Sequence, residues 1–185
     1  MAISDTAIQN RALTLLSADP IQVANETSEQ ARKVRALYET TRDAMLSEHN
    51  WNFAMKERLL SLLSDEPIKD DWDYEYQLPT DCLRVVSLEG DYEFAIYSNK
   101  LYTNTDDARI LYVSRETDPN KFSAGFVKAL ASRLAADLAF GITQNATMAT
   151  NMDAMAVRDL KEAKWSDGQE GKGMKVVRGS MVDGY

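Results

Sequence analysis

Hydrophobic residues recur at helical spacing in the first 50 residues. In the first segment they fall at Ile8, Ala12, Leu15 and Leu16, and in the next at Ala31, Val34, Tyr38 and Met45, with Thr41 in the same stripe. A period of three to four residues indicates amphipathic helices that each bury one face. Thr27, with Gln30 three residues later, is typical of a capping box at the start of the second helix. We therefore predict two helices before residue 50.

A second pair of helices is predicted in the C-terminal half. Asp118 is a favoured N-cap and Pro119 suits the first helical position. The apolar positions that follow are Phe122, Phe126, Val127, Leu130, Ala131, Leu134, Ala135 and Leu138. A helix this apolar is expected to lie at the centre of the bundle. A fourth helix is predicted from about Thr147 to Trp165, with inward positions at Met148, Met152, Met155, Ala156, Leu160 and Ala163.

The period shortens between residues 51 and 115, where short runs are rich in β-branched and aromatic residues. The runs are Arg58–Leu63, Trp72–Leu78, Leu83–Leu88, Tyr92–Tyr97, Lys100–Thr103 and Ala108–Arg115. Between two of them, Ser98-Asn99 is typical of a tight hairpin turn. Short strands connected in sequence predict a small antiparallel sheet.

The predicted fold class is α+β. It is a helical bundle of about four helices, with a small antiparallel β-rich insertion between the second and third helices and an extended C-terminal tail. The expected parts are a discontinuous bundle (1–50 and 116–165), the β-rich insertion (51–115) and a flexible tail (166–185). The tail is rich in glycine and lacks periodicity, yet apolar and basic residues alternate in it. Such a composition favours a segment that is disordered alone and folds onto a partner subunit.

Composition restricts the chemistry that the chain can perform. Cys82 is the only cysteine and His49 the only histidine, whereas zinc sites take several such ligands. A serine nucleophile would have to use His49 as its base, and a cysteine nucleophile would have to be Cys82 paired with the same histidine. We interpret His49 as a capping or packing residue. The formal net charge of -8 disfavours nucleic-acid binding but is compatible with DNA sliding past a repelling surface. No run approaches a membrane span and no signal peptide is recognised, so a soluble chain made in a cytoplasm is expected.

Carboxylates are frequent between residues 65 and 76, and from Asp71 to Tyr76 they alternate with aromatic residues. Such a segment is compatible with a glycosidase pair or with hard-cation binding, although its spacing fits no specific motif. We favour a half-buried edge strand with an aromatic core face and a charged solvent face. No phosphate-binding glycine loop or nucleophile elbow is found. We therefore expect no catalytic, cofactor-binding or metal-binding residues.

Two motifs together resemble a known family. Asn50-Trp51-Asn52-Phe53-Ala54 follows a long helix and precedes Arg58, and the segment from Tyr76 to Val85, which contains Leu78, Pro79 and Asp81, opens the strand region. The combination resembles tail tubular protein A, the head-to-tail adaptor of short-tailed bacteriophages (podoviruses). The likeness covers most of the chain and is weakest at both termini.

The resemblance implies a structural protein rather than an enzyme. It implies a dodecameric ring beneath the portal protein, which extends the DNA channel, seats the tail nozzle protein and lets DNA pass without sequence-specific binding. The protein would be part of the virion tail, assembled in the bacterial host cytoplasm. Trp51 and Phe53 would fill the junction between bundle and sheet. Arg58 would pair with an acidic neighbour or a carbonyl, while Pro79 and Asp81 would fix a turn after the strand that ends at Leu78.

Two segments are the candidates for partner contacts. The candidate portal-binding residues lie in the tail: Met174, Val176, Val177, Arg178, Met181, Val182 and Tyr185. The candidate nozzle-side hairpin comprises Tyr97, Ser98, Asn99 and Lys100. Three alternatives remain open: a glycan-cleaving tail component that uses carboxylates among Asp70, Asp71, Asp73 and Glu75, a head-completion protein of another connector type, and a cellular regulatory or scaffolding module.

Overall fold

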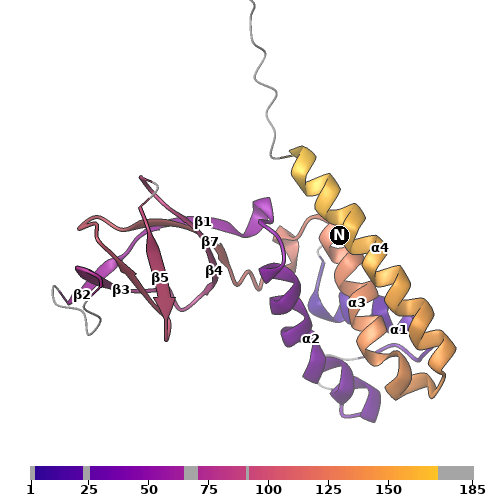
Figure 1. Cartoon of the computed structure of the whole chain (residues 1–185). Coiled ribbons are helices and arrows are strands. Elements are labelled where there is room, and N and C mark those ends of the chain that lie inside the picture. Colours follow the sequence, from indigo (N-terminus) through magenta and orange to yellow (C-terminus); the bar gives the residue numbers. More distant parts are fainter. Residues whose placement is uncertain (1–2, 23–25, 65–70, 91, 171–185) are drawn as a thin grey trace, which may run out of the picture.

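A computed structural model describes residues 3–22, 26–64, 71–90 and 92–170. The molecule has two parts, a bundle of helices and a β unit that projects from one side of it (Figure 1). The helices are α1 (Asp5–Leu15), α2 (Glu29–Ser47), α3 (Ala124–Thr143) and α4 (Ala146–Glu170). The strands all lie between α2 and α3 in the sequence. The predicted α+β class, with a β-rich insertion in a four-helix bundle, is confirmed.

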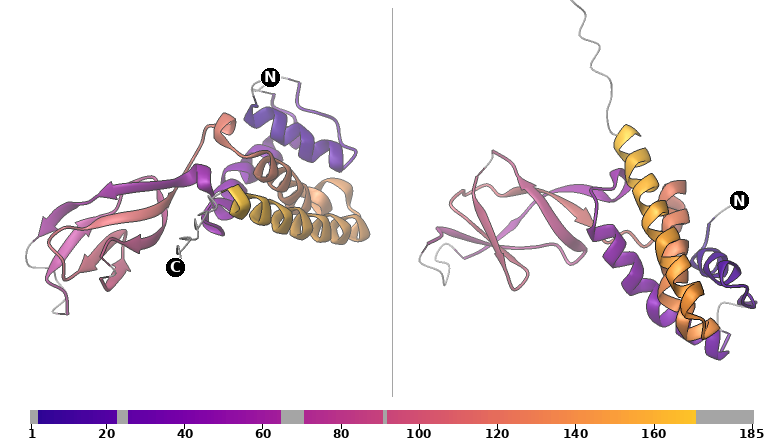
Figure 2. Two further views of the ribbon diagram at one scale, coloured as in Figure 1. Left: turned by 90° about the horizontal axis from the view of Figure 1, so that it is seen from above. Right: turned by 45° about the vertical axis from the view of Figure 1, so that its right-hand side comes forward.

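Helix α3 lies at the centre of the bundle, as its apolar surface predicted. It contacts α1, α2 and α4, and α4 packs along it as an antiparallel neighbour (Figure 2). Phe126, Leu130 and Leu134 are fully buried. Near the start of α3, Gly125 faces the backbone of Ala163, where a Cβ atom would approach to 3.3 Å. Small residues thus permit the close approach of α3 and α4.

The start of α2 differs by one residue from the prediction. Ser28, not Thr27, is the N-cap, and its Oγ accepts a hydrogen bond of 3.3 Å from the amide of Ala31. Both residues carry a hydroxyl that is able to cap a helix, so the local pattern does not separate them. The predicted inward stripe from Ala31 to Met45 is buried and therefore confirmed.

The start of α3 also lies later than predicted. Asp118 and Pro119 begin only a short 3₁₀ helix, η2 (Pro119–Lys121), in which Asp118 accepts from the amide of Asn120. After Phe122 the chain is extended, and α3 starts at Ala124 with Ser123 as its N-cap. The two consecutive caps explain the difference, because each forms a local turn of its own.

Helix α4 continues past the boundary that was predicted at Trp165. It runs to Glu170, so residues 166–170 belong to the bundle rather than to the tail. The glycine at position 168 does not end the helix, because the buried side chain of Asp167 anchors this turn, as described below. Residues 171–185 lie outside the described residues.

The β unit contains two antiparallel sheets rather than the single small sheet expected. Strands β1 (Met55–Leu59), β7 (Arg109–Ser114) and β4 (Cys82–Leu88) form one sheet in that order. The other has the order β2 (Ser61–Ser64), β3 (Tyr74–Gln77), β6 (Lys100–Thr103) and β5 (Phe94–Tyr97). The core between them includes Tyr76, Leu101, Ile110 and Tyr112. The β unit therefore has a hydrophobic core of its own.

A single chain segment supplies one edge strand to each sheet. Leu60 lies between β1 and β2, is buried in the β core, and donates its amide hydrogen to the carbonyl of Ala108 at 2.8 Å. The predicted strand from Arg58 to Leu63 is therefore divided at Leu60. Among the described residues, no helix is both long and apolar enough to cross a membrane.

Candidate functional site

A cluster of aromatic rings fills the junction between the helical bundle and the β unit. Trp51 has no solvent exposure, and its ring centroid lies 4.8 Å from that of His49 and 4.9 Å from that of Phe126. Phe53 also packs against Phe126, with centroids 5.1 Å apart. The indole Nε1 of Trp51 donates to the carbonyl of Met45 at 2.9 Å. The prediction that Trp51 and Phe53 fill this junction agrees with their positions.

Asp167 connects the last turn of α4 to the same junction. Its Oδ2 lies 3.1 Å from Nε2 of His49, and its two carboxylate oxygens lie 3.2 and 3.3 Å from the amide nitrogen of Asn52. The side-chain amide of Asn52 donates in return to the carbonyl of Asp167 at 2.7 Å. Asp167 is only 3 % exposed. His49 is thus a packing and hydrogen-bonding residue, as interpreted from the sequence, whereas Asp167 was missed.

Polar contacts also fasten the β unit to α2. Nε of Arg115, just after β7, lies 2.7 Å from the carboxylate of Asp43. Arg84, on β4, donates to the carbonyl of Ser47 at 3.0 Å and to the side chain of Asn50. These contacts join the ends of two strands to the end of one helix. Together with the aromatic cluster they limit rotation of the β unit about the connecting segments.

Asp81 lies at the turn between β3 and β4. The turn closes with a hydrogen bond of 3.0 Å from the amide of Cys82 to the carbonyl of Pro79. The carboxylate of Asp81 accepts from Lys56 at 2.9 Å and from the hydroxyl of Tyr112 at 3.2 Å. Partial burial alone would raise the pKa of Asp81, but these donors outweigh it and hold the pKa below its ordinary value. Asp81 therefore fixes β1 and β7 as well as the turn.

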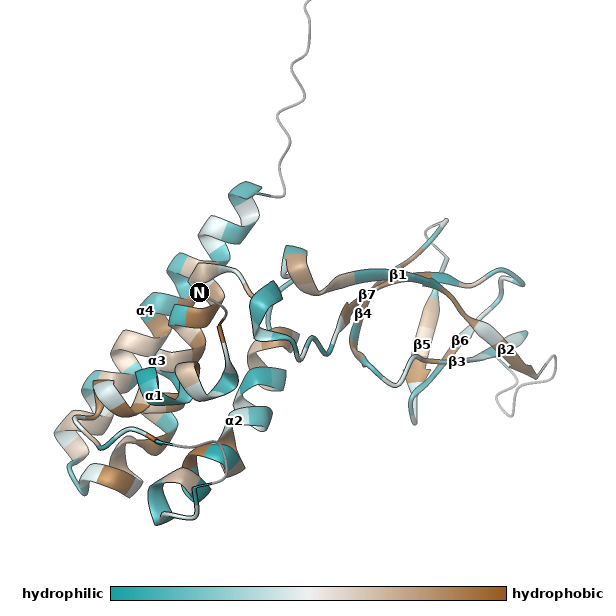
Figure 3. Cartoon of the chain, turned by 180° about the vertical axis from the view of Figure 1, so that it is seen from behind, coloured by the Kyte–Doolittle hydropathy of each residue, from teal (hydrophilic) through white to brown (hydrophobic). Residues whose placement is uncertain are grey.

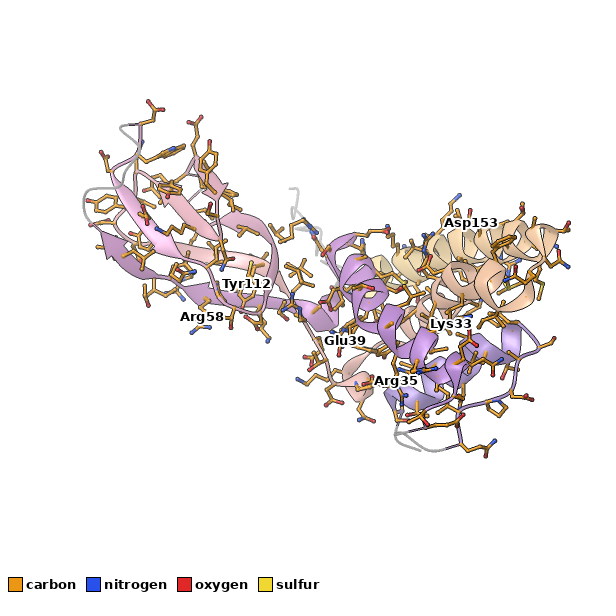
Figure 4. The ribbon with its side chains drawn as sticks, turned by 90° about the horizontal axis from the view of Figure 1, so that it is seen from below. Lys33, Arg35, Glu39, Arg58, Tyr112 and Asp153 are labelled. Carbon is orange, nitrogen blue, oxygen red and sulfur yellow. The ribbon has the colours of Figure 1, made fainter. Side chains whose placement is uncertain are left out.

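Arg58 is exposed on β1, with its strand paired to β7, which carries Tyr112 (Figure 4). Its side chain lines a groove of about 250 Å³ together with Leu78 and Pro79, both of which are buried. The predicted scaffold residues Arg58, Leu78 and Pro79 thus come together, although they were assigned separate roles. Trp51 and Phe53 lie apart from them, at the other end of β1.

The strand of alternating carboxylates and aromatic residues has a different position from the one predicted. β3 lies between β2 and β6 and is not an edge strand. Glu75 is 4 % exposed rather than facing solvent, because Lys100 on β6 covers it and pairs with its carboxylate at 2.5 Å. Sequence alternation predicts the two faces of a strand but not which side chains from the neighbouring strand cover them.

This pairing bears on the glycan-hydrolase alternative. The hydrogen bond from Lys100 lowers the pKa of Glu75, which keeps the carboxyl ionised and disfavours a general-acid role. Asp71 and Asp73 are exposed, and Asp70 lies outside the described residues. Within the described ranges, no group of three or more His, Cys, Asp or Glu side chains is placed to hold a metal ion.

The hairpin at Ser98-Asn99 forms as predicted. Both residues have positive φ, +48° and +63°, which is the left-handed conformation that a type I′ turn requires at its two central positions. Tyr97 is 46 % exposed beside this turn, whereas Lys100 is engaged with Glu75. The other predicted contact segment, from Met174 to Tyr185, lies outside the described residues.

Large apolar side chains are exposed on both parts of the molecule, and of these the sequence analysis singled out only Tyr97. On the bundle they are Phe140, Val157 and Trp165, and on the β unit they are Leu59, Leu62, Leu63, Tyr92, Ile96 and Tyr97. Trp165 is the most exposed of them, at 70 %. Such side chains indicate a surface that meets other proteins where they lie together in one patch, whereas single ones are common on any protein.

Comparison of the sequence with models of known protein families and with curated proteins found no match.

Proposed function

We propose that the chain is the structural subunit of a head-to-tail adaptor in a short-tailed bacteriophage. It forms a ring beneath the portal protein, extends the DNA channel and seats the tail nozzle. The observation that carries the proposal is the position of the motif residues: the segment from Asn50 to Ala54, one of the two motifs that resemble tail tubular protein A, builds the joint between the two parts. The function then consists in assembly.

A braced joint suits a protein that connects two partners. Trp51 is buried among the rings of His49, Phe53 and Phe126, Asp167 holds the segment after α2 against α4, and the contact from Arg115 to Asp43 adds a second point of attachment. Force or torque applied to the β unit is thereby transmitted to the bundle through several contacts. A flexible linker would not hold a channel in register above a nozzle.

Contacts with the partners are assigned to two segments of the chain. The segment from Met174 to Tyr185, which follows α4, binds the portal, and the hairpin at Ser98-Asn99 meets the nozzle. The net charge of -8 suits a lumen through which DNA passes without adhering. The number of copies is twelve if the resemblance to tail tubular protein A extends to assembly.

The test is binding of the purified chain to a purified portal ring. The full-length protein is compared with a variant that ends after Glu170, because an earlier end would remove Asp167 and disturb the joint itself. We expect the full-length protein to bind and the shortened variant to bind at least tenfold more weakly. Equal binding by both would remove the tail from the mechanism, and no binding by either would reject the adaptor function.

A matched variant distinguishes binding to the portal from binding to the nozzle. Tyr97→Ala alters an exposed ring next to the hairpin and leaves the tail intact. It is expected to bind the portal as the full-length protein does and to bind the nozzle more weakly. Cleavage of a cell-wall or capsular glycan, lost in a folded Asp73→Asn variant, would favour the hydrolase alternative instead.

A further inference from the structure

The four-stranded sheet ends in two strands that carry no charged residue. The edges of this sheet are β2, with the sequence Ser-Leu-Leu-Ser, and β5, with the sequence Phe-Ala-Ile-Tyr. Each of the other described strands contains at least one Lys, Arg or Glu. Proteins usually protect an exposed sheet edge with charged residues, proline or a covering element, because its free amide and carbonyl groups are able to pair with another strand. Within the four-stranded sheet the uncharged strands are at the edges, and the strands that carry a charged residue, β3 and β6, are inside.

One cross-strand row of side chains links the two edges. Leu62 on β2 is paired with Tyr76, Tyr76 with Leu101, and Leu101 with Ile96 on β5. The two inner members are buried, at 2 % and 0 % exposure, whereas Leu62 and Ile96 are 44 % and 42 % exposed. The apolar row therefore continues to both edges of the sheet and remains open at its ends. Figure 3 shows β2 and much of β5 in the brown shades of hydrophobic residues.

We propose that β5 of one copy pairs with β2 of the next copy, so that the four-stranded sheets of neighbouring subunits form one continuous sheet. Ile96 then lies beside Leu62 of the neighbour, and the interrupted row is completed across the interface. The inference rests on the proposed function in so far as it names the contact that joins the copies of the ring.

The strand directions support this head-to-tail arrangement. Each neighbouring pair in the order β2-β3-β6-β5 is antiparallel, so β2 and β5 run in opposite directions. A neighbour that is displaced sideways along the sheet, without being turned over, presents its β2 antiparallel to β5. The same step repeats from copy to copy. Interfaces made from two different surfaces of one subunit generate rings when the rotation between copies closes.

The features that the two edges share indicate that their binding partner is a second copy of the same chain. Both edge strands are four residues long, both are uncharged, and each ends the same row of side chains. An unrelated protein would need only one of these edges, whereas a repeating subunit uses both. Strand addition supplies main-chain hydrogen bonds, and the paired side chains set the register.

Two lysine variants of the full-length chain test the inference. Leu62→Lys blocks the β2 edge and Ile96→Lys blocks the β5 edge, and both substitutions are at exposed positions. Sedimentation velocity is measured over a concentration series that extends to the highest soluble concentration. We expect the unmodified chain to form species larger than a dimer and each variant alone to remain monomeric. An equimolar mixture of the two should stop at a dimer, because only one intact pair of edges is left.

A lysine substitution away from the sheet edges serves as the control for the proposed strand pairing. Val157→Lys, at a 60 % exposed position on α4, is expected to assemble like the unmodified chain, and thermal unfolding verifies that all three variants are folded. An unmodified chain that stays monomeric throughout the series overturns the inference. Dimers of Leu62→Lys alone would indicate β5 pairing with β5 instead, and assemblies unaffected by both lysines would place the contact elsewhere. The last result leaves the adaptor function standing, since portal binding is measured separately.

Discussion

The carboxylate of Asp167, near the end of α4, lies 3.1 Å from Nε2 of His49, just after the end of α2. The two residues are 118 positions apart in the sequence. The same carboxylate accepts from the amide of Asn52, so one buried side chain holds the segment in which the helical bundle gives way to the β unit. The last turn of α4 is therefore part of the joint and not the start of a tail.

Replacing Asp167 with Ala is expected to lower the free energy of unfolding by about 2 kcal/mol, because a buried charged acceptor is lost and the amide of Asn52 is left without its partner. Urea denaturation at neutral pH measures the change. Glu170→Ala is the control, since Glu170 is exposed in the next turn of the same helix. A loss of equal size in both variants would contradict a specific role for Asp167.

Trp51 is expected to be one of the most sensitive positions for stability. Trp51→Ala removes a fully buried indole and its hydrogen bond to Met45, and such deletions cost about 3–5 kcal/mol. Trp165 offers a matched control, because it is 70 % exposed and its replacement by Ala should change stability by about 0.5 kcal/mol or less. Thermal unfolding that is unchanged in Trp51→Ala would disprove the assignment.

The helical part of the fold was largely predictable, because the buried face of a helix repeats every three to four residues. The inward stripe of α2 followed from this period, and the central position of α3 followed from the large number of its apolar residues. The exact starts did not follow, since Thr27 and Ser28 are both able to cap, and so are Asp118 and Ser123. Which hydroxyl or carboxylate is used depends on how the preceding chain packs.

The contacts that brace the junction and the order of the strands were not predictable in the same way. Asp167 resembles any polar residue of a surface helix until its distant partners are known. Likewise, β3 was expected at an edge, and only pairing with β2 and β6 places it inside the sheet. Strand order is set by long-range pairing, so a local pattern of alternation contains no information about which strands remain at the edges.

The contribution of Asp159 to stability is expected to depend on pH. It is 2 % exposed on α4 and accepts from Ser132 at 2.6 Å and from Lys128 at 3.1 Å. Burial alone would raise the pKa of Asp159, but these donors on α3 outweigh it and lower the pKa. A carboxyl with a lowered folded pKa stabilises the fold above its unfolded pKa, about 3.9, and loses that contribution as the pH falls through the folded pKa.

Asp159→Asn is therefore expected to be less stable than the unmodified chain by about 2 kcal/mol at pH 7, since the charged acceptor is lost. The difference should shrink once the pH falls below about 4. Urea denaturation at several pH values measures both. Asp153→Asn is the control: its side chain is 62 % exposed and its contact with Arg133 is long, 3.4 Å, so a change of at most about 0.5 kcal/mol is expected. A difference for Asp159→Asn that does not depend on pH would contradict the lowered pKa.

Replacement of a serine by glycine is expected to change stability in opposite directions at the hairpin turn and within a strand. Ser98 has a φ of +48°, a conformation that costs energy for any residue with a Cβ atom, so Ser98→Gly is expected to stabilise the fold by about 0.5–1 kcal/mol. Ser87 is exposed within β4, where φ is not positive, and Ser87→Gly should instead destabilise by a similar amount. Thermal unfolding of the two variants provides the comparison. Destabilisation by both would show that the turn at Ser98-Asn99 is not held in the left-handed conformation in solution, and the position of the neighbouring Tyr97 would then need to be reassigned.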